Sequence, residues 1–182
     1  MDLVHFTGKK DLPSLTLVLG GAASGKSWVA EKLIESSGLS PLYLATSRIW
    51  DDETQKRVDV HKSRRDARWT TIDAPVDVAT PLRQAAADQA VLLDCATMWL
   101  TNLMMDEQDI PAAQHGLFDA ARATPAPVVI VSNEVGQGIV PDNAMAREFR
   151  EVQGRFNIAL AEVSDAVVHV VAGLPVTLKG AL

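Results

Sequence analysis

Apolar runs and more polar segments alternate along this chain. Short uninterrupted apolar runs, typical of strands buried on both faces of a sheet, predict strands over 15–19, 41–45, 90–94, 127–132 and 165–172. Residues 69–73 form a shorter extended piece, and 174–178 are expected to turn back as an antiparallel edge strand. The intervening segments predict helices over 26–37, 75–88, 97–105 and 144–164. This alternation predicts an α/β fold with a mainly parallel central sheet and an antiparallel C-terminal edge.

Size and composition are those of one domain. The 182 residues, 47% of them hydrophobic, suffice for a sheet covered by helices, so 1–182 is interpreted as one domain with a polar N-terminal extension over 1–13. No apolar run approaches the roughly 20 residues that span a membrane, and the N-terminus lacks the apolar core of a signal peptide. We therefore expect a soluble cytoplasmic protein. The single cysteine, Cys95, is expected to be a small buried hydrophobe.

Charge is unevenly distributed. Seventeen Lys and Arg against 23 Asp and Glu give a formal net charge of −6, which argues against a nucleic-acid-binding protein. Six of the basic residues nevertheless fall between positions 56 and 68, namely Lys56, Arg57, Lys62, Arg64, Arg65 and Arg68. A local basic patch on an acidic protein suits a small polyanionic ligand.

A glycine-rich segment follows the first predicted strand and opens the first predicted helix. It consists of Gly20, Gly21, Ala22, Ala23, Ser24, Gly25, Lys26 and Ser27. This is the spacing of a phosphate-binding loop, in which glycines let backbone N–H groups and the helix N-terminus surround a polyphosphate. Lys26 would reach the β- and γ-phosphates, and Ser27 would bind Mg²⁺. The segment predicts a nucleoside triphosphate site; the alternative is a glycine-rich turn without a ligand.

Other polar residues stand where predicted strands end. Asp94 ends an apolar strand downstream of the phosphate-binding loop, a pattern typical of a residue of the Mg²⁺ shell, although such an Asp can also cap the next helix. Thr46 and Ser47 lie at the same ligand-binding edge. Asn133 and Glu134 begin a loop with two glycines and a proline, where they would orient a metal-bound water, accept a hydroxyl proton or hold the loop.

The basic segment contains one histidine. If residues 51–68 are helical, one face carries Arg57, His61, Arg64, Arg65 and Arg68. Neighbouring cations favour the neutral, nucleophilic form of an imidazole and collect phosphate oxygens. The alternative is a solvated basic helix with an incidental histidine.

Together these segments resemble the adenosylcobinamide kinase/adenosylcobinamide-phosphate guanylyltransferase family of cobalamin biosynthesis. The similarity extends from Leu15 to Lys179, and its most specific part is the loop from Asn133 to Pro141. The other matching segments are 20–27, 43–47, His61 with the basic stretch and Trp69, 92–95 and 171–175. One departure is Ala23, where the family commonly has Arg, so an arginine contact is missing from the loop.

The resemblance implies a RecA-like, three-layer αβα P-loop NTPase fold and two reactions. ATP or GTP phosphorylates adenosylcobinamide, and GMP is then transferred from GTP to adenosylcobinamide phosphate with release of pyrophosphate. His61 matches the histidine that carries GMP, Mg²⁺ is the cofactor with Ser27 and Asp94 as its ligands, and family members form trimers. The matching nucleotide contacts are Gly20, Gly21, Ala22, Ala23, Ser24, Gly25, Lys26, Ser27, Ala45, Thr46, Ser47, Lys62, Ser63, Arg64, Arg65, Asp73 and Asp94.

Two rival functions remain at this point. A plain P-loop small-molecule kinase uses Lys26, Ser27 and Asp94 but gives His61 no role. A non-catalytic nucleotide switch would need an Asn-Lys-x-Asp guanine-binding motif at the end of a late strand, where this chain has Asn-Glu-Val-Gly from Asn133.

Overall fold

The computed structural model describes residues 11–182, apart from the side chains of Glu53 and Arg57. Most of the extension predicted over 1–13 therefore lies outside the described residues. The described chain forms one seven-stranded sheet in the order β3-β2-β4-β5-β1-β6-β7. The strands are β1 (Leu15–Gly20), β2 (Ser40–Ala45), β3 (Thr70–Asp73), β4 (Gln89–Asp94), β5 (Val128–Asn133), β6 (Ala166–Val171) and β7 (Leu174–Lys179). Neighbours are parallel except for β6 and β7, which confirms the predicted fold class.

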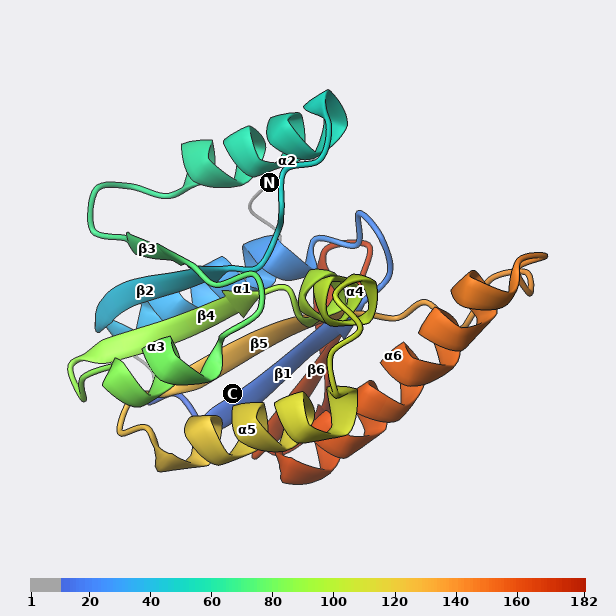
Figure 1. Ribbon diagram of the computed structural model, residues 1–182. Helices are drawn as coiled ribbons and strands as arrows, with labels where there is room; N and C mark the ends of the chain where they lie inside the picture. The colour runs from blue at the N-terminus through green and yellow to red at the C-terminus, as the bar shows by residue number, and fades with distance from the viewer. Residues whose placement is uncertain (1–10) are drawn as a thin grey trace.

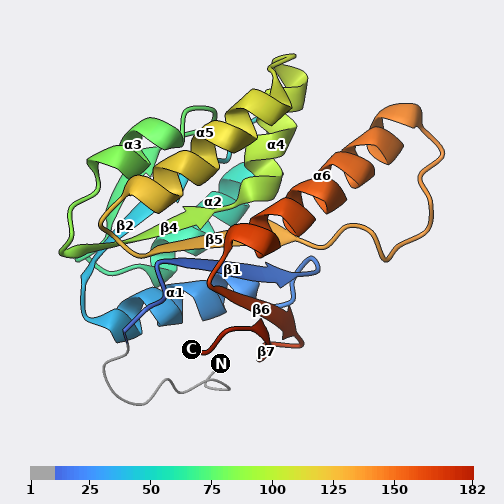
Figure 2. The same cartoon turned by 90° about the horizontal axis from the view of Figure 1, so that it is seen from below.

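Helices cover both faces of this sheet, as Figures 1 and 2 show. They are α1 (Lys26–Ser37), α2 (Asp52–Arg64), α3 (Ala79–Gln84), α4 (Ala96–Met105), α5 (Ile110–Ala123) and α6 (Ala144–Val163). Helix α1 packs on one face and α3 to α6 pack on the other, which gives three layers. Helix α2 lies beyond the strand ends, set apart from the sheet, and the first half of α6 projects away from it. Among the described helices, none has the length and apolar character needed to cross a membrane.

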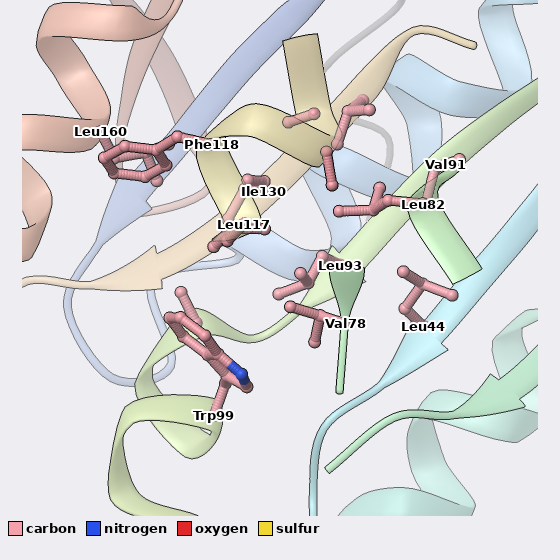
Figure 3. Packing of buried hydrophobic residues seen from close by; sticks show 14 of the residues in the cluster. Leu44, Val78, Leu82, Val91, Leu93, Trp99, Leu117, Phe118, Ile130 and Leu160 are labelled. Atoms are coloured by element: carbon pink, nitrogen blue, oxygen red, sulfur yellow. The ribbon is translucent and has the colours of Figure 1, made fainter. Parts of the chain in front are cut away.

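The larger core lies between the sheet and α3 to α6 (Figure 3). Leu44, Leu93 and Ile130 of three adjacent strands are fully buried against Leu82 of α3 and Trp99 of α4. The Trp99 ring also packs at 5.8 Å from the ring of Phe156 in α6. Because close-packed interiors hold their surroundings rigidly, this core fixes the carboxyl ends of the parallel strands, where the polar residues gather.

Local signals set the ends of several helices. Helix α1 follows Gly25 and stops at Gly38, both with positive φ, 92° and 70°. The carboxylate of Asp51 accepts a hydrogen bond from Thr54 N at 2.7 Å, and the side chain of Asn143 accepts one from Ala146 N at 2.7 Å. Such caps satisfy N–H groups that the first helical turn leaves unpaired, so α2 and α6 begin where the sequence predicts.

The helix expected over 75–88 is wrong in extent, because only α3 is helical. The carbonyls that precede α3 are engaged elsewhere: Pro75 O accepts from Asn102 Nδ2 at 2.8 Å, and Val76 O accepts from Trp99 Nε1 at 2.8 Å. Tertiary contacts thus take the groups that a longer helix would have used.

Candidate active site

The phosphate-binding loop joins β1 to α1. Gly20 is closely packed, because a Cβ there would lie 2.5 Å from Ser24 Oγ and 2.8 Å from Val170 O. Ala23 and Gly25 have positive φ, 55° and 92°, which wraps the loop around the N-terminus of α1. Lys26 is buried, and its Nζ donates a hydrogen bond to Gly21 O at 3.0 Å. Burial lowers the pKa of Lys26, and the negative charge of Asp94 opposes that shift.

Asp94 lies next to this loop at the carboxyl end of β4. Its Oδ1 accepts from Ser27 Oγ at 3.4 Å, and its Oδ2 accepts from Tyr43 OH at 3.2 Å. Burial raises the pKa of Asp94, and the neighbouring His61 works against that shift. Burial also raises the pKa of Tyr43, so the phenol stays a hydrogen-bond donor.

Ser27 and Asp94 fit a magnesium ion. Both offer oxygen atoms, and the buried Asp94 carboxylate lacks the solvent that normally stabilises its charge. The described residues contain no cluster of three or more His, Cys, Asp or Glu side chains able to hold a metal. Mg²⁺ usually binds through one or two protein oxygens together with substrate phosphates and water.

His61 lies in the last turn of α2 and reaches Asp94. Its Nδ1 is 3.5 Å from Asp94 Oδ2, 3.9 Å from Glu31 Oε1 and 2.8 Å from Arg64 Nη2. Nδ1 is therefore the ring nitrogen engaged with the protein. The histidine of the basic segment and the carboxylate beside the phosphate-binding loop, 33 positions apart in sequence, form one cluster.

The single basic face expected over 51–68 is wrong, because α2 ends at Arg64. Arg65 is extended, with φ −93° and ψ 130°, and its Cζ lies 3.4 Å from the centroid of the Tyr43 ring. Arg68 instead pairs with Asp66 at 2.8 Å. Arg65 and Arg68 therefore do not contribute to a ring of cations around His61. Its Nδ1 faces one cation, Arg64, and two carboxylates, Asp94 and Glu31.

The remaining predicted nucleotide contacts lie along the same edge of the sheet. Ala45 pairs in register with Asp73 of β3 and with Asp94 of β4. Thr46 follows and is buried; its Oγ1 donates to Cys95 O and accepts from Cys95 N, both at 2.8 Å, so this side chain is engaged within the protein. Three parts of this set flank the phosphate-binding loop from the β2 and β3 side: the segments 45–47 and 62–65 and the residue Asp73. Among them, Lys62, Ser63 and Asp73 are exposed.

The loop that follows β5 is tied to the phosphate-binding loop. Glu134 N donates to Gly20 O at 3.0 Å, and Glu134 Oε1 accepts from Gly136 N at 2.5 Å. Arg150 of α6 donates to Gly136 O. Of the three roles open for Glu134, these contacts favour holding the loop.

Sequence reasoning missed Tyr43 and Glu31 as site residues. Tyr43 is read as one more apolar residue of a buried strand, although its hydroxyl binds Asp94. Glu31 lies among the buried residues Val29, Ala30 and Leu33 of α1, and is itself 3% exposed. A charged residue within an apolar helix face is a signal that could have identified it.

The phosphate-binding loop, the acidic residue that ends β4 and the parallel sheet define a P-loop NTPase fold of the RecA-like kind. Two solved structures share this fold. The flagellar accessory protein FlaH from Methanocaldococcus jannaschii has a TM-score of 0.51 and 12% identity, with coverage of 93% of this chain and 80% of that one. An ATPase from the type III secretion system of pathogenic bacteria has a TM-score of 0.53 and 10% identity, with coverage of 91% and 57%. Identities this low establish the fold alone.

Sequence comparison establishes the family. The model of the family described as cobinamide kinase / cobinamide phosphate guanyltransferase matches residues 16–178. The chain is 41% identical over 167 residues to the bifunctional adenosylcobalamin biosynthesis protein CobP of Pseudomonas aeruginosa, covering 90% of this chain and 96% of that protein. It is 42% identical over 183 residues to the bifunctional adenosylcobalamin biosynthesis protein CobU of Salmonella typhimurium, covering 91% and 99%. The chain belongs to this family of enzymes.

Proposed function

We propose that this enzyme catalyses two successive reactions at one site. ATP or GTP phosphorylates the aminopropanol hydroxyl of adenosylcobinamide, and GMP is then transferred from GTP to the new phosphate, giving adenosylcobinamide-GDP and pyrophosphate. The observation that carries this proposal is the 3.5 Å separation of His61 Nδ1 from Asp94 Oδ2, which puts a nucleophilic side chain beside the acidic residue of the phosphate-binding site. A plain kinase gives that histidine no role.

In the second reaction, His61 acts as the nucleophile. Because Nδ1 faces Asp94, Glu31 and Arg64, we assign the attack to Nε2. For this step Nδ1 holds the ring proton and faces Asp94 Oδ2, which can accept it, so that Nε2 has a free lone pair. A bond forms between Nε2 and the α-phosphorus of GTP while the bond from that phosphorus to the bridging oxygen breaks, and pyrophosphate leaves. A phosphate oxygen of adenosylcobinamide phosphate then attacks the same phosphorus, the N–P bond breaks, and His61 is restored.

The other site residues bind the polyphosphate of the nucleotide and compensate its negative charge. The backbone of 20–25 and Lys26 hold the polyphosphate, Arg64 and Arg65 lie at the end of α2 to receive its charge, and Ser27 and Asp94 would hold Mg²⁺. When bound, Mg²⁺ neutralises the charge that develops on phosphate oxygens. Asp73 and 45–47 remain proposed nucleotide contacts.

A product assay tests the proposal. The enzyme is incubated with adenosylcobinamide and Mg²⁺, with ATP alone, GTP alone or both, and the corrinoid products are separated and identified by mass. We expect adenosylcobinamide phosphate with ATP alone, and adenosylcobinamide-GDP with pyrophosphate whenever GTP is present. A reaction that stops at adenosylcobinamide phosphate with GTP present would support the plain kinase, and binding without turnover would support a nucleotide switch.

We further propose that the protein is a cytoplasmic homotrimer, since ATP and GTP are supplied in the cytoplasm and the family resemblance implies trimers. Three apolar side chains support association: Ile139, Val140 and Met145 are 97%, 66% and 65% exposed. They lie where the loop after β5 and the start of α6 project beyond the sheet (Figures 1 and 2). Exposed apolar residues grouped in this way are typical of protein–protein contacts.

A further inference from the structure

Glu31 is a buried carboxylate that the proposed reactions leave without a role. It lies on α1, the helix that begins at the phosphate-binding loop, and is 3% exposed. Burying a carboxylate is costly unless a cation or hydrogen-bond donor pairs with it. Its partners come from the last turn of α2: Arg64 Nη2 lies 3.2 Å from Glu31 Oε1, and His61 Nδ1 lies 3.9 Å from the same oxygen.

Helix α2 depends on such polar contacts for its position. Figure 1 shows it apart from the sheet, and its exposed apolar residue Val60 points to solvent rather than to a core. Three contacts tie the end of the helix to the body of the protein: Arg64 with Glu31, His61 with Asp94, and Arg65 with the Tyr43 ring. The Glu31–Arg64 pair has one partner on the rigid helix α1, so it can fix the orientation of the turn that carries His61.

Arg64 is the link between the two groups. Its Nη2 is shared between Glu31 Oε1 at 3.2 Å and His61 Nδ1 at 2.8 Å, since residues three apart on a helix lie on one face. A guanidinium only donates, so Arg64 competes with the Nδ1 proton that Nε2 needs on the other ring nitrogen in order to attack. We propose that Glu31 is a positioning residue for guanylyl transfer: by accepting from Arg64 it draws the guanidinium away from Nδ1 of His61, so that Nδ1 keeps its proton toward Asp94 and the lone pair of Nε2 is left for the α-phosphate of GTP. This inference rests on the proposed function. Phosphorylation of the corrinoid uses the phosphate-binding loop and Asp94 and does not require His61.

The test separates the two half-reactions in a Glu31→Gln variant, which keeps the size of the side chain and removes its charge. The covalent attachment of label from α-labelled GTP is followed by rapid quench without corrinoid, and GTP affinity and ATP-dependent corrinoid phosphorylation are measured alongside. A small displacement of a reacting group costs one to two orders of magnitude in rate, so labelling should slow at least about tenfold. GTP affinity and phosphorylation should change less than about twofold, because neither is proposed to depend on the state of His61 Nδ1.

The matched control is Glu35→Gln. Glu35 lies one turn further along α1 and pairs with Lys32 at 2.6 Å rather than with Arg64 or His61, so the same loss of charge should leave all three measurements at their wild-type values. Glu31→Asp keeps the charge but shortens the side chain, and its labelling rate should fall between those of wild type and Glu31→Gln. Because Glu31 is proposed to act through Arg64, adding Arg64→Gln to Glu31→Gln should slow labelling less than the product of the two single effects.

The other possible results would overturn either this inference or the guanylyl-histidine on which it rests. Unchanged labelling in a folded Glu31→Gln protein would overturn the inference, as would an equal loss of labelling, GTP affinity and phosphorylation, which indicates a purely structural role. If Glu31→Gln does not fold, Glu31→Asp decides by the same comparison of labelling with phosphorylation. A wild-type enzyme that acquires no label would overturn the guanylyl-histidine itself, and this inference with it, whereas labelled wild type with equally labelled variants overturns the inference alone.

Discussion

Asp94 is the residue that contacts both the phosphate-binding loop and His61. Its two oxygens accept from Ser27 of the phosphate-binding loop and from Tyr43 of β2, and Oδ2 also faces His61 of α2. A buried carboxylate with this many partners is held in one orientation, which keeps it available both to a metal ion and to the imidazole. Tyr43 is the partner that sequence patterns treat only as core.

Replacing Tyr43 with Phe tests whether the phenol holds the Asp94 carboxylate. The ring and its contact with the Arg65 guanidinium are retained. The 3.2 Å hydrogen bond to Asp94 and the interaction of the hydroxyl with Arg65 are lost, and the buried carboxylate is left less satisfied. We expect the free energy of unfolding to fall by about 1.5–3 kcal/mol, the usual effect of removing a hydrogen bond to a buried charged group. Urea denaturation without nucleotide measures it; no change in stability would show that the phenol does not support Asp94.

Cys95 gives a prediction with a defined dependence on pH. Although part of the residue is accessible, its surroundings raise the pKa of the thiol to about 11, chiefly through burial and also through the charge of Asp94. At pH 8 the thiolate fraction is then about a hundredfold lower than in the unfolded chain, and the greater nucleophilicity of the more basic thiolate offsets only part of that difference. Alkylation by iodoacetamide should be at least about tenfold slower in the folded protein.

Mass spectrometry reads this reaction directly, because Cys95 is the single cysteine of the chain. The urea-unfolded protein is the control. Since ionisation is disfavoured only in the folded state, the stability contributed by the protonated thiol should decline as pH rises above about 9. Equal alkylation rates in the folded and unfolded proteins at pH 8 would contradict the raised pKa.

At the scale of elements, the connection between β1 and α1 leaves little room for change. A Cβ at Gly20 would lie 2.8 Å from the backbone oxygen of Val170 in β6, which cannot move without disturbing the sheet. Gly21, the next residue, has no atom within 4 Å of the same added Cβ. Close packing therefore excludes a side chain at Gly20, whereas it does not exclude one at Gly21.

Gly20→Ala and Gly21→Ala form a matched pair that tests this difference. We expect Gly20→Ala to lower the free energy of unfolding by about 1–3 kcal/mol, as overpacking does, while Gly21→Ala stays within about 0.5 kcal/mol of wild type. Denaturation by urea without nucleotide measures both. Equal stability of the two variants would show that close packing at Gly20 is not what restricts it.

Local elements could be predicted from the sequence, and their contacts could not. The phosphate-binding loop, α1 with Gly38 at its end, and the capping by Asn143 depend on neighbouring residues, so pattern and spacing suffice. The end of α2 depends on Arg65 leaving the helix to stack on Tyr43, a contact 22 positions away in sequence. The helix predicted over 75–88 is too long for the same reason, because the backbone oxygens of Pro75 and Val76 bind side chains of α4.

The contact of His61 with Asp94 is the part of the site that no local pattern contains. His61 is recognisable as a histidine among basic residues, and Asp94 as an acid at a strand end, but their proximity follows from the sheet order that places β2 beside β4. The partners of Glu31 are likewise distant, since His61 and Arg64 lie 30 and 33 residues further along the chain. Its charge within an apolar helix face marks it as unusual but does not indicate what it binds.

At the scale of the whole molecule, one edge of the sheet carries the phosphate-binding loop, the proposed metal ligands Ser27 and Asp94, and the proposed nucleophile His61. Parallel strands bring their carboxyl ends to one edge, and crossover connections bring the loops that follow them there. A single nucleotide site can therefore serve both proposed reactions, with α2 supplying only what the second one needs.

The proposed trimer predicts the mass of the protein in solution and a position at which a substitution should lower that mass. In analytical ultracentrifugation the protein should sediment at three times the mass of the chain. Ile139→Asp places a charge at a side chain that is 97% exposed, so it should not affect folding but should shift the mass toward that of one chain if the loop is an interface. Wild-type protein that sediments as a single chain would contradict the trimer, and an unchanged mass in Ile139→Asp would place the interface elsewhere.

The central claim is that His61 carries GMP, and covalent labelling tests it most directly. Wild-type enzyme and His61→Ala are incubated with Mg²⁺ and GTP labelled at the α-phosphate, without corrinoid, and the denatured chains are analysed. We predict acid-labile, base-stable label on the wild-type chain, located at His61, and none on His61→Ala even though that variant still binds GTP. Bound GTP without any covalent label on the wild type, or equal label on both proteins, would contradict the mechanism.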